Sequence, residues 1–483
     1  MSDSTTPVIV AVTQLNGLPP GCEEPIDLLD AVAAQALAEV PALVPSINLV
    51  GAVKTGTKRY GNAPGILAAR RGLGRVGTVQ TDFGGQTAQL LIAHAAAAIR
   101  DGSAEAVLLG GCEMGSLLRR KLGHIPNDGE QDQPDLTLGD DVRTWMYHPH
   151  EASLGLTEPL QLYPLLETAI AWSKGETIEQ HMRGTARLWA DFSEVASRNP
   201  YAADRQVHSA DALLSAGPDN RYVGYPYTKQ MNSNQFVDQA AAFVLCSVAA
   251  AKRAGIPRDR WVFPWAAAQA QSPFVSERKF LHLSPQLARA GRAVAAMTGR
   301  PAADATLVDL YACFPSAVQL QAAALEIPAG RPLTLTGGMR FAGGPWNSYG
   351  LHMLANVVGA LREQPDEYAL ACTNGGFATR FVLGAYAGRP HPQGFQTAPA
   401  PFTAEAGDKR PLDAAPSGEA AIEAFSVVHD KTNTPTLGIV TCRTPGEARA
   451  WALFQDAASL DQLLAMQSPG RRVRFANGQA VLV

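Results

Sequence analysis

The sequence predicts an α/β protein in which helices cover a layered, largely parallel sheet. Three observations lead to this fold class. Short β runs alternate with amphipathic helices near the N-terminus, the same rhythm returns in the second half of the chain, and a weak internal repeat relates the two stretches. Strands that alternate with helices are typical of βαβ units, whose strands run parallel.

The hydrophobic pattern places the individual elements. In the first stretch we expect strands at Val8–Val12, Ile47–Val53, Val79–Phe83 and Ala106–Leu109. Helices are expected at Pro25–Val40 and Ala63–Arg71, and a third helix follows the strand Val79–Phe83 directly and runs through Ile99. Further along, Leu162–Ser173, Ile178–Ser197 and Ala240–Ala251 have the length of helices, and strands are expected at Trp261–Ala266, Thr306–Tyr311, Leu333–Leu335, Tyr368–Ala371 and Phe381–Ala385. Residues 113–232 interrupt the rhythm with helices among polar loops, which indicates an insertion.

The internal repeat runs through paired glycines. Gly84-Gly85 opens a helix, and the strand after that helix ends in Gly110-Gly111. Gly343-Gly344 opens a second helix, and the next strand ends in Gly375-Gly376. The order of features is the same in both copies, which indicates two similar halves.

The C-terminal region has a different character. Residues 387–420 are rich in Pro and Ala without an apolar period, as in a linker or a surface wrap. Beyond them we expect strands at Phe425–His429, Thr436–Cys442, Arg472–Phe475 and Ala480–Val483, with a helix at Leu460–Gln467. The predicted division is 1–255 for the first half with its insertion at about 113–232, 256–390 for the second half, and 391–483 for a linker and a small β-rich domain.

Composition narrows the classes of partner. Only 17% of residues are charged and the net charge is −4, so the basic surface that nucleic acids or anionic membranes require is not expected. No run of about 18 apolar residues predicts a membrane span. The first residues lack the basic-then-apolar pattern of a signal peptide, and the six cysteines form no CxxC pair, so a cytoplasmic location is expected. His148-Pro-His150 is better interpreted as a solvated loop than as a metal site.

Two glycine-rich segments need separate interpretations. Gly72-Leu-Gly74-Arg-Val-Gly77 matches GxGxxG, but a helix precedes it and a strand follows, the reverse of a dinucleotide-binding motif, so we interpret it as a turn. Thr81–Thr87 is a strand-to-helix elbow, a place where helix N-termini activate nucleophiles. Its glycines provide no side chain, and Thr87 is more typical of a helix cap than of a nucleophile.

Three segments of the second half carry candidate polar side chains. Asp309–Ser316 runs from a strand into a helix and places Tyr311 and Cys313 near a helix N-terminus, although a buried structural cysteine is the alternative. Gly343–His352 is the densest polar cluster, in which Asn347 and Tyr349 could point into a pocket and a lone His352 is more often structural. Cys372 ends a strand before Gly375-Gly376 and is expected to be exposed enough to react, with core packing as the alternative.

These elbows, in this order, resemble the thiolase superfamily over about residues 7–390. Ala106–Glu113 resembles its "AGG-E" strand, Val237–Ala242 its "NDGAAA" element, Gly343–Pro345 its "GHP" element and Cys372–Gly376 its "C-x-G-G" element. The phrases Pro226–Asn234, Asp309–Gln319 and Gly343–His352 are more similar to the subgroup called thiolase-like protein type 1, which has an additional C-terminal domain.

The resemblance implies a specific architecture and ligand. It implies a five-layer αβαβα thiolase fold made of two similar halves, with an inserted helical loop domain and a small, OB-like C-terminal domain. It also implies a homodimer, a coenzyme A thioester as ligand or substrate without a covalently bound cofactor, and a partner enzyme in lipid or steroid degradation.

Transferred position by position, most of the thiolase catalytic set is missing. The nucleophilic cysteine falls at or beside Gly85, and the histidine of "GHP" falls on Gly344. The histidine of an "HDCF" element falls on Tyr311, with Cys313 keeping its place, and the acid/base cysteine is present as Cys372. Covalent acyl transfer needs a nucleophile and a base within hydrogen-bond reach, so ordinary thiolase turnover is not expected.

The sequence therefore predicts a thiolase-like protein that binds CoA or acyl-CoA without a cysteine nucleophile, and that could break or form carbon–carbon bonds on acyl-CoA. The candidate catalytic residues are Cys372, Tyr311, Cys313, Tyr349 and His352, and the candidate CoA-binding residues are Asn347, Ser233 and Asn234. The alternatives are a non-catalytic acyl-CoA-binding protein and a structural subunit of a lipid-metabolism complex.

Overall fold

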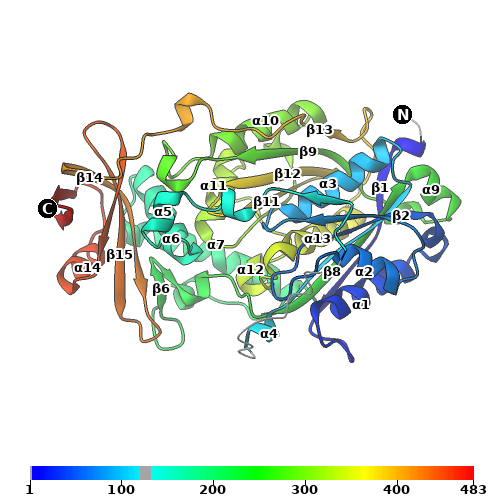
Figure 1. Cartoon of the computed structure of the whole chain (residues 1–483), viewed down its shortest axis with the longest axis horizontal. Helices are drawn as coiled ribbons and strands as arrows, with labels where there is room; N and C mark the ends of the chain where they lie inside the picture. The colour runs from blue at the N-terminus through cyan, green and yellow to red at the C-terminus, as the bar shows by residue number, and fades with distance from the viewer. Residues whose placement is uncertain (1–2, 120–131) are drawn as a thin grey trace.

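The computed structural model describes residues 3–119 and 132–483 (Figure 1). Within these residues, the first sheet has six strands. In spatial order the strands are β1 (Pro7–Asn16), β8 (Asp238–Ser247), β4 (Ala106–Met114), β2 (Ile47–Ala52), β3 (Gly77–Thr81) and β5 (Leu136–Leu138). β2 is parallel to β3 and β4, as the strand–helix alternation predicts, whereas β8 is antiparallel to β1 and β4.

The expected helix at Ala240–Ala251 is wrong. This run forms strand β8, and a short helix, α9 (Val248–Arg253), begins only after it. β8 lies between β1 and β4, and its residues from Gln239 onward are buried on both faces. A strand covered on both faces loses the apolar–polar alternation, so its sequence cannot be distinguished from a buried helix by periodicity.

Helices cover both faces of this sheet. α1 (Pro25–Ala38), α2 (Ala63–Arg70) and α9 pack on the outer face, in a cluster that includes Val8 and Val10. α3 (Thr87–Arg100) and α13 (Tyr349–Glu363) pack on the inner face, in a cluster that includes Ile9. Alternate residues of one strand therefore belong to different hydrophobic layers, as the two-residue period of a strand requires.

A second sheet lies on the other side of α3 and α13. Its strands, in order, are β10 (Leu307–Leu310), β11 (Tyr368–Gly375), β12 (Arg380–Ala387), β9 (Phe263–Gln271) and β13 (Gln396–Thr397). α10 (Pro285–Thr298) and α11 (Pro315–Ala324) pack against its outer face. Two sheets with helices outside and between them give the five-layer αβαβα architecture, and the fold-class prediction is confirmed.

The expected strand at Leu333–Leu335 is wrong. The Leu333 carbonyl accepts a hydrogen bond from the backbone N–H of Leu310, but the segment forms no ladder and leads into α12 (Gly338–Phe341). The hydroxyls of Thr334 and Thr336 donate to the buried carboxylate of Asp309 at 3.0 and 2.6 Å. Side-chain bonds of this kind compete with a strand for the backbone conformation.

The two sheets share one topology. The order β1-β8-β4-β2 in the first sheet corresponds to β9-β12-β11-β10 in the second, and each sheet has its own elbow helix, α3 or α13. These two helices pack against each other in the central layer. The two similar halves predicted from the repeated glycine pairs are thus present in the structure.

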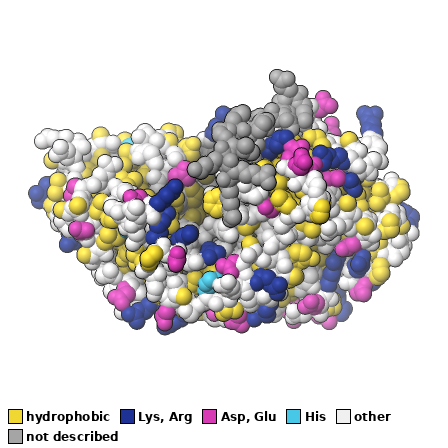
Figure 2. All heavy atoms as spheres, turned by 90° about the horizontal axis from the view of Figure 1, so that it is seen from below, with side chains coloured by type: hydrophobic (Ala, Val, Ile, Leu, Met, Phe, Trp, Pro, Cys, Tyr) yellow, Lys and Arg dark blue, Asp and Glu magenta, His cyan; other side chains and the backbone are white. Residues whose placement is uncertain are grey.

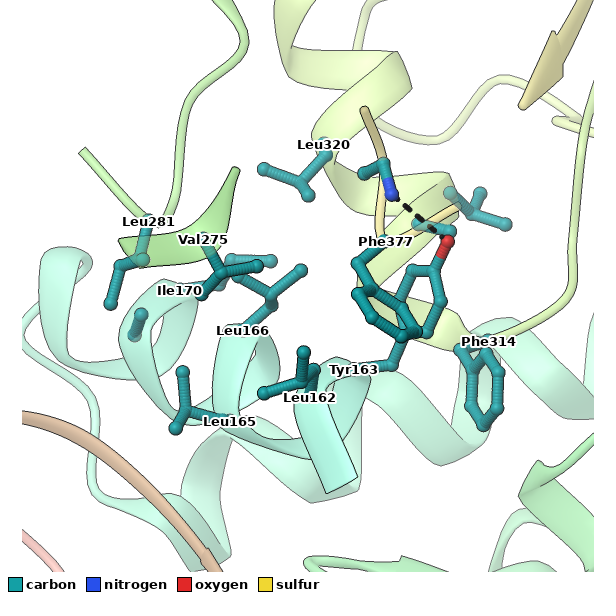
Figure 3. Packing of buried hydrophobic residues seen from close by; sticks show 14 of the residues in the cluster. Leu162, Tyr163, Leu165, Leu166, Ile170, Val275, Leu281, Phe314, Leu320 and Phe377 are labelled. Atoms are coloured by element: carbon teal, nitrogen blue, oxygen red, sulfur yellow. Dashed lines mark hydrogen bonds between the residues drawn. The ribbon is translucent and has the colours of Figure 1, made fainter. Parts of the chain in front are cut away.

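The insertion is mainly helical. It contains α4 (Gly115–Arg119), α5 (Pro149–Ser153), α6 (Pro159–Ser173), α7 (Ile178–Arg198), α8 (Ala210–Leu214) and the short strands β6 (Tyr222–Tyr225) and β7 (Tyr227–Thr228). Figure 3 shows the side of α6 that carries Leu162, Leu166 and Ile170 packed against Val275 and Leu320 of the second half. The insertion therefore shares a hydrophobic core with the sheet that it covers.

The C-terminal strands form a third sheet at the opposite end of the molecule from β1 and β2 (Figure 1). It contains β14 (Gly418–His429), β15 (Pro435–Arg443), β16 (Arg449–Phe454), β17 (Arg472–Ala476) and β18 (Gln479–Leu482), and α14 (Ala457–Leu464) packs on β15. β16 was not expected from the sequence. The inserted strand β6 pairs with β14, so the third sheet combines distant parts of the chain.

The surface carries both signs of charge. Figure 2 shows Lys/Arg and Asp/Glu side chains intermingled with hydrophobic ones across the described residues of one face. Within residues 3–119 and 132–483, none of the helices combines the length and the hydropathy that a membrane crossing needs.

Candidate functional site

The two elbows meet at the N-termini of α3 and α13. Gly84 and Gly343 have φ angles of 146° and 111°, which L side chains rarely adopt, so glycine is required at each turn. Asn347 connects the halves: its Oδ1 accepts a hydrogen bond from the Gly84 N–H at 3.0 Å, and its Nδ2 donates to the Lys54 carbonyl at 2.9 Å. Asn347 thus fixes the elbows relative to each other and is not part of the cavity lining described next.

A cavity of about 490 Å³ lies beside the elbows. Both halves and the insertion contribute to it. Its lining includes Gly85, Met146, Glu158, Pro159, Leu160, Tyr163, Val223, Asn232, Ser233, Gln235, Tyr311, Cys313, Phe314, Met339, Gly344, Trp346, Asn374, Gly375 and Gly376. A mostly apolar concavity with a few convergent polar groups is typical of a small-molecule site. None of these lining residues comes from the C-terminal strands β14–β18, and the third sheet contributes only Val223, from the inserted strand β6.

The position of the missing nucleophile is filled by other atoms. A Cβ placed on Gly85 would lie 2.3 Å from the Tyr311 hydroxyl oxygen and 2.4 Å from the Asn374 carbonyl oxygen. Both distances are far below van der Waals contact. A Cβ on Gly344 would meet the Asn234 carbonyl at 3.1 Å and the Met339 methyl at 3.2 Å, so this elbow is less crowded. Tyr311 therefore occupies the volume that a side chain at Gly85 would need.

Tyr311 is a neutral hydrogen-bond donor in this site. Only 4% of the residue is exposed, and its hydroxyl donates to the Trp346 carbonyl over 3.3 Å. Burial, with a smaller contribution from Cys313, raises the pKa of Tyr311 well above its ordinary value. Tyr349 packs edge-to-face on it with ring centroids 5.2 Å apart, but Tyr349 does not line the cavity. The phenol of Tyr311 stays protonated at neutral pH.

Cys313 lies next to Tyr311 on the cavity wall. Burial raises the pKa of its thiol to about 12, so the thiol is neutral near pH 7. The Asn374 side-chain nitrogen approaches the Cys313 sulfur to 3.7 Å. The site therefore offers a phenol, a thiol and an amide, together with the Ser233 hydroxyl and the Glu158 carboxylate, and no activated thiolate.

Tyr163 of α6 holds the Asn374–Gly376 turn in place. Its hydroxyl donates to the Gly376 carbonyl at 2.7 Å and accepts from the Ala378 N–H at 3.1 Å and from Asn374 Nδ2 at 2.9 Å. Figure 3 shows the ring between Phe314, on which it stacks at 4.5 Å, and Phe377. Sequence reasoning missed Tyr163, which reaches the site only through tertiary packing, and passed over Asn374 within the segment Cys372–Gly376.

Cys372 does not lie where it was expected. Strand β11 continues to Gly375, so Cys372 is in mid-strand, paired with Leu310 and Leu383. Its side chain is 0% exposed within the hydrophobic core, and burial raises the pKa of the thiol well above its ordinary value. The expectation that Cys372 is exposed enough to react is wrong, and core packing, the alternative, is what the structure shows. The residues that line the cavity come after it, at Asn374, Gly375 and Gly376.

The other candidates have structural contacts. His352 is buried, its Nδ1 lies 2.8 Å from Gln14 Oε1, and burial lowers the pKa of the ring to about 3. Ser233 lines the cavity, and its hydroxyl donates to the Cys313 carbonyl at 2.7 Å. Asn234 is not part of the lining and connects Met339 to Gly344 through its backbone. The structure thus brings Gly85, Ser233, Tyr311, Cys313 and Gly344 together and leaves the remaining candidates outside the cavity.

Trp346 is a lining residue that sequence reasoning missed. Its φ angle of 41° is unusual for a residue other than glycine, and its carbonyl is the acceptor for Tyr311. Strained backbone of this kind persists only where the surroundings impose it, often at ligand sites. Trp346 lies in the polar cluster Gly343–His352, where the sequence pointed to Asn347 and Tyr349 as the candidate pocket residues.

The GxGxxG segment and the His148-Pro-His150 segment have structural roles, as a turn and as a helix start. Gly72–Gly77 connects α2 to β3, as the turn interpretation predicted. His148 caps α5, with its Nδ1 accepting a hydrogen bond from the His150 N–H at 3.1 Å. Over the described ranges, no three His, Cys, Asp or Glu side chains come together as metal ligands.

Comparisons with known proteins agree with this description. Residues 400–479 match the family model "Thiolase-like protein type 1 additional C-terminal domain". The whole chain aligns with the whole of a monomeric SCP2-thiolase-like protein type 1 from Mycobacterium smegmatis, with 26% identity and a TM-score of 0.83. A structure titled "Ltp2-ChsH2(DUF35) aldolase" is 18% identical over 80% of this chain and 99% of the other, with a TM-score of 0.61, and shares the fold. No functionally curated protein matches the chain in sequence.

Proposed function

We propose that this chain, which resembles thiolase-like proteins of type 1 along its whole length and in its C-terminal domain, binds an acyl-CoA thioester without forming an acyl-enzyme. One observation carries the proposal. The Tyr311 hydroxyl and the Asn374 carbonyl occupy the volume around Gly85 from which a nucleophilic side chain would act. An acyl-enzyme of the thiolase kind needs a nucleophile at that position and a base at the facing elbow, and Gly85 and Gly344 have no side chain to provide either.

The cavity itself suits the acyl part of such a ligand. Its volume of about 490 Å³ and its lining of Met146, Leu160, Phe314 and Met339 favour a sizeable apolar group. The Tyr311 hydroxyl lies next to Gly85, where the elbows place the reacting end of a thioester in the thiolase family. The ligand would therefore enter with its thioester toward the elbows and its acyl chain among the apolar side chains.

A second candidate function is carbon–carbon bond cleavage or formation on the bound acyl-CoA. The observation that favours it is the convergence of the Tyr311 phenol and the Cys313 thiol, both protonated donors, at the end of the cavity where the thioester would lie. In a retro-aldol step a base, for which the Glu158 carboxylate of the lining is the candidate, takes the hydroxyl proton; the carbon–carbon bond breaks to give a carbonyl compound and a thioester enolate, and the enolate takes the proton back. A neutral donor at the thioester oxygen stabilises that enolate.

Assembly and location are further proposals. The resemblance to thiolases predicts a homodimer, whereas the Mycobacterium smegmatis protein is described as monomeric. We retain the homodimer, a partner enzyme of lipid degradation and a cytoplasmic location as hypotheses. Light scattering on the purified protein at several concentrations decides the first of them.

Calorimetric titration with CoA and acyl-CoAs, together with intact-protein mass spectrometry, tests the proposed function. We expect saturable binding of acyl-CoA and no mass increase on the protein. Two cysteine substitutions provide a matched pair: Cys313→Ala, in the cavity lining, should change the affinity, and Cys372→Ala, in the core, should change stability only. No binding at all, or an acyl adduct on any side chain, would contradict the proposal.

A further inference from the structure

The side-chain amide oxygen of Asn374, Oδ1, is buried and has no hydrogen-bond partner among the described residues. The residue is 1% exposed and lines the cavity. Its Oδ1 has no hydrogen-bond partner among residues 3–119 and 132–483, whereas its Nδ2 contacts both Tyr163 and Cys313. Buried polar atoms are nearly always paired, so an unpaired one in a cavity wall requires an explanation.

The orientation of this amide follows from its neighbour. A tyrosine hydroxyl has one proton and two lone pairs. The proton of Tyr163 goes to the Gly376 carbonyl at 2.7 Å, and one lone pair accepts from the Ala378 N–H. The Asn374 atom 2.9 Å from the Tyr163 oxygen must therefore be a donor, which makes it the nitrogen. The amide cannot be turned over without placing two acceptors face to face, so Oδ1 is the free atom.

A free acceptor in this position selects among ligands. An unsatisfied buried acceptor lacks a hydrogen bond that a ligand restores if it brings a donor. The Asn374 backbone borders the position of the Gly85 side chain, next to which the reacting end of a thioester would lie. A hydroxyl on the acyl chain close to the thioester is the donor that fits, because carbonyl and hydrocarbon groups provide no proton.

The cavity wall contains a complementary group of the opposite kind. Trp346 Nε1, a donor, is also buried without a hydrogen-bond partner in the part of the chain that the structure describes. A thioester carbonyl is an acceptor. The cavity lining therefore contains one unpaired acceptor, Asn374 Oδ1, and one unpaired donor, Trp346 Nε1. These two atoms match a ligand that carries a hydroxyl and a carbonyl group a few bonds apart.

We propose that Asn374 is a specificity-determining residue whose Oδ1 accepts a hydrogen bond from a hydroxyl at carbon 3 of the bound acyl group. This inference rests on the proposed acyl-CoA binding and adds the class of acyl group, the 3-hydroxyacyl thioesters. Tyr163 is a positioning residue in this scheme, because it fixes which end of the Asn374 amide faces the ligand.

The test is a calorimetric comparison of octanoyl-CoA, 3-oxooctanoyl-CoA and 3-hydroxyoctanoyl-CoA with the full-length protein. The three ligands share chain length and pantetheine amides, and only the third donates from carbon 3. We expect it to bind about 5- to 100-fold more tightly than the other two. An equal gain for the 3-oxo compound would overturn the inference, since a ligand acceptor would then be the group recognised.

Substitutions assign the effect to the residue. Asn374→Ala should abolish the preference for the hydroxyl while octanoyl-CoA still binds. Asn356→Ala makes the same chemical change outside the cavity lining, where the side chain bonds Thr336 and the His352 carbonyl, and should preserve the ratio of affinities. If Asn374→Ala does not fold, the wild-type series alone decides. Binding of all three ligands without preference refutes the role of Asn374 and leaves acyl-CoA binding intact, whereas binding of none refutes both proposals.

Discussion

Adding a single methyl group at Gly85 tests whether Tyr311 has replaced the nucleophile in space. In Gly85→Ala the new Cβ would lie 2.3 Å from the Tyr311 hydroxyl oxygen, 2.6 Å from the carbon that bears it, and 2.4 Å from the Asn374 carbonyl oxygen. The tyrosine ring is packed against Tyr349, and the carbonyl is backbone of a turn held by Tyr163. Neither obstacle can move without breaking other contacts.

The magnitude follows from overpacking. Forcing an extra methyl into a packed core costs about 1–3 kcal/mol, and we expect the upper end because one of the contacts is with backbone. Tyr311→Phe removes the atom at 2.3 Å but leaves the contacts at 2.4 and 2.6 Å. The double substitution should therefore recover about 1 kcal/mol of the loss, a coupling that a double-mutant cycle resolves.

Equilibrium urea unfolding of the four proteins measures these differences. Gly359→Ala is the matched control: it makes the same chemical change on helix α13 at a position with nothing within 4 Å, and it should stabilise the protein by about 0.5–1 kcal/mol. If Gly85→Ala were as stable as the wild type or as the control, the space beside Gly85 would be open. The argument against a covalent mechanism would then be wrong.

Four further perturbations test other parts of the description. Tyr163→Phe leaves three polar partners unsatisfied, so we expect a loss of about 1–3 kcal/mol in urea unfolding and weaker acyl-CoA binding. Burial lowers the pKa of His181, but its hydrogen bond and charge interaction with Glu167 outweigh burial and raise it. The resulting stability is present below the ordinary histidine pKa of about 6.5 and is lost as pH rises through the raised pKa, so His181→Gln should remove the loss of stability that the wild type shows as pH rises above the ordinary histidine pKa. Phe425 is a buried residue of β14, in the core that this strand shares with α6, and Phe425→Ala should lower the free energy of unfolding by about 3–5 kcal/mol in the same assay. Cys313, with its pKa raised to about 12, should react slowly with iodoacetamide near pH 8 and faster as pH rises, as peptide mass spectrometry would show; rapid alkylation at pH 7 would contradict a neutral thiol.

The fold was accessible from the sequence where the hydrophobic period is clear. α1, α6 and α7 begin within three residues of the expected positions. Pro25 and the Thr177 cap mark the starts of α1 and α7, α7 has a clear amphipathic pattern, and α6 is a helix-length apolar run that is buried almost throughout. Strand β8 was mistaken for a helix since it is covered on both faces. β16 was missed in a region with several charged and turn-forming residues, where no alternation stands out.

The candidate site was accessible only in part. The elbows placed Gly85, Tyr311, Cys313 and Gly344 together, since all four follow from matched strand–helix turns. Cys372 was misplaced because the expected strand ended at Ala371, four residues before the observed end of β11 at Gly375, so Cys372 lies in mid-strand and not at a strand end. Contacts from the insertion, such as that of Tyr163 with the turn after β11, depend on packing that the sequence does not encode locally.

The pairing of β6 with β14 limits how the C-terminal domain can be handled as a separate piece. β17 covers β14 along Gly418–Ala421, whereas Val427 and Val428 pair with β6 of the insertion, about 200 residues earlier in the chain. A fragment cut at the boundaries of the matched domain would expose that stretch of edge, which invites aggregation. A soluble excised fragment would need the insertion supplied as a second chain, so the two pieces would behave as a split protein that reassembles through a shared strand, and a gene fusion that moves the domain alone would not transfer its fold.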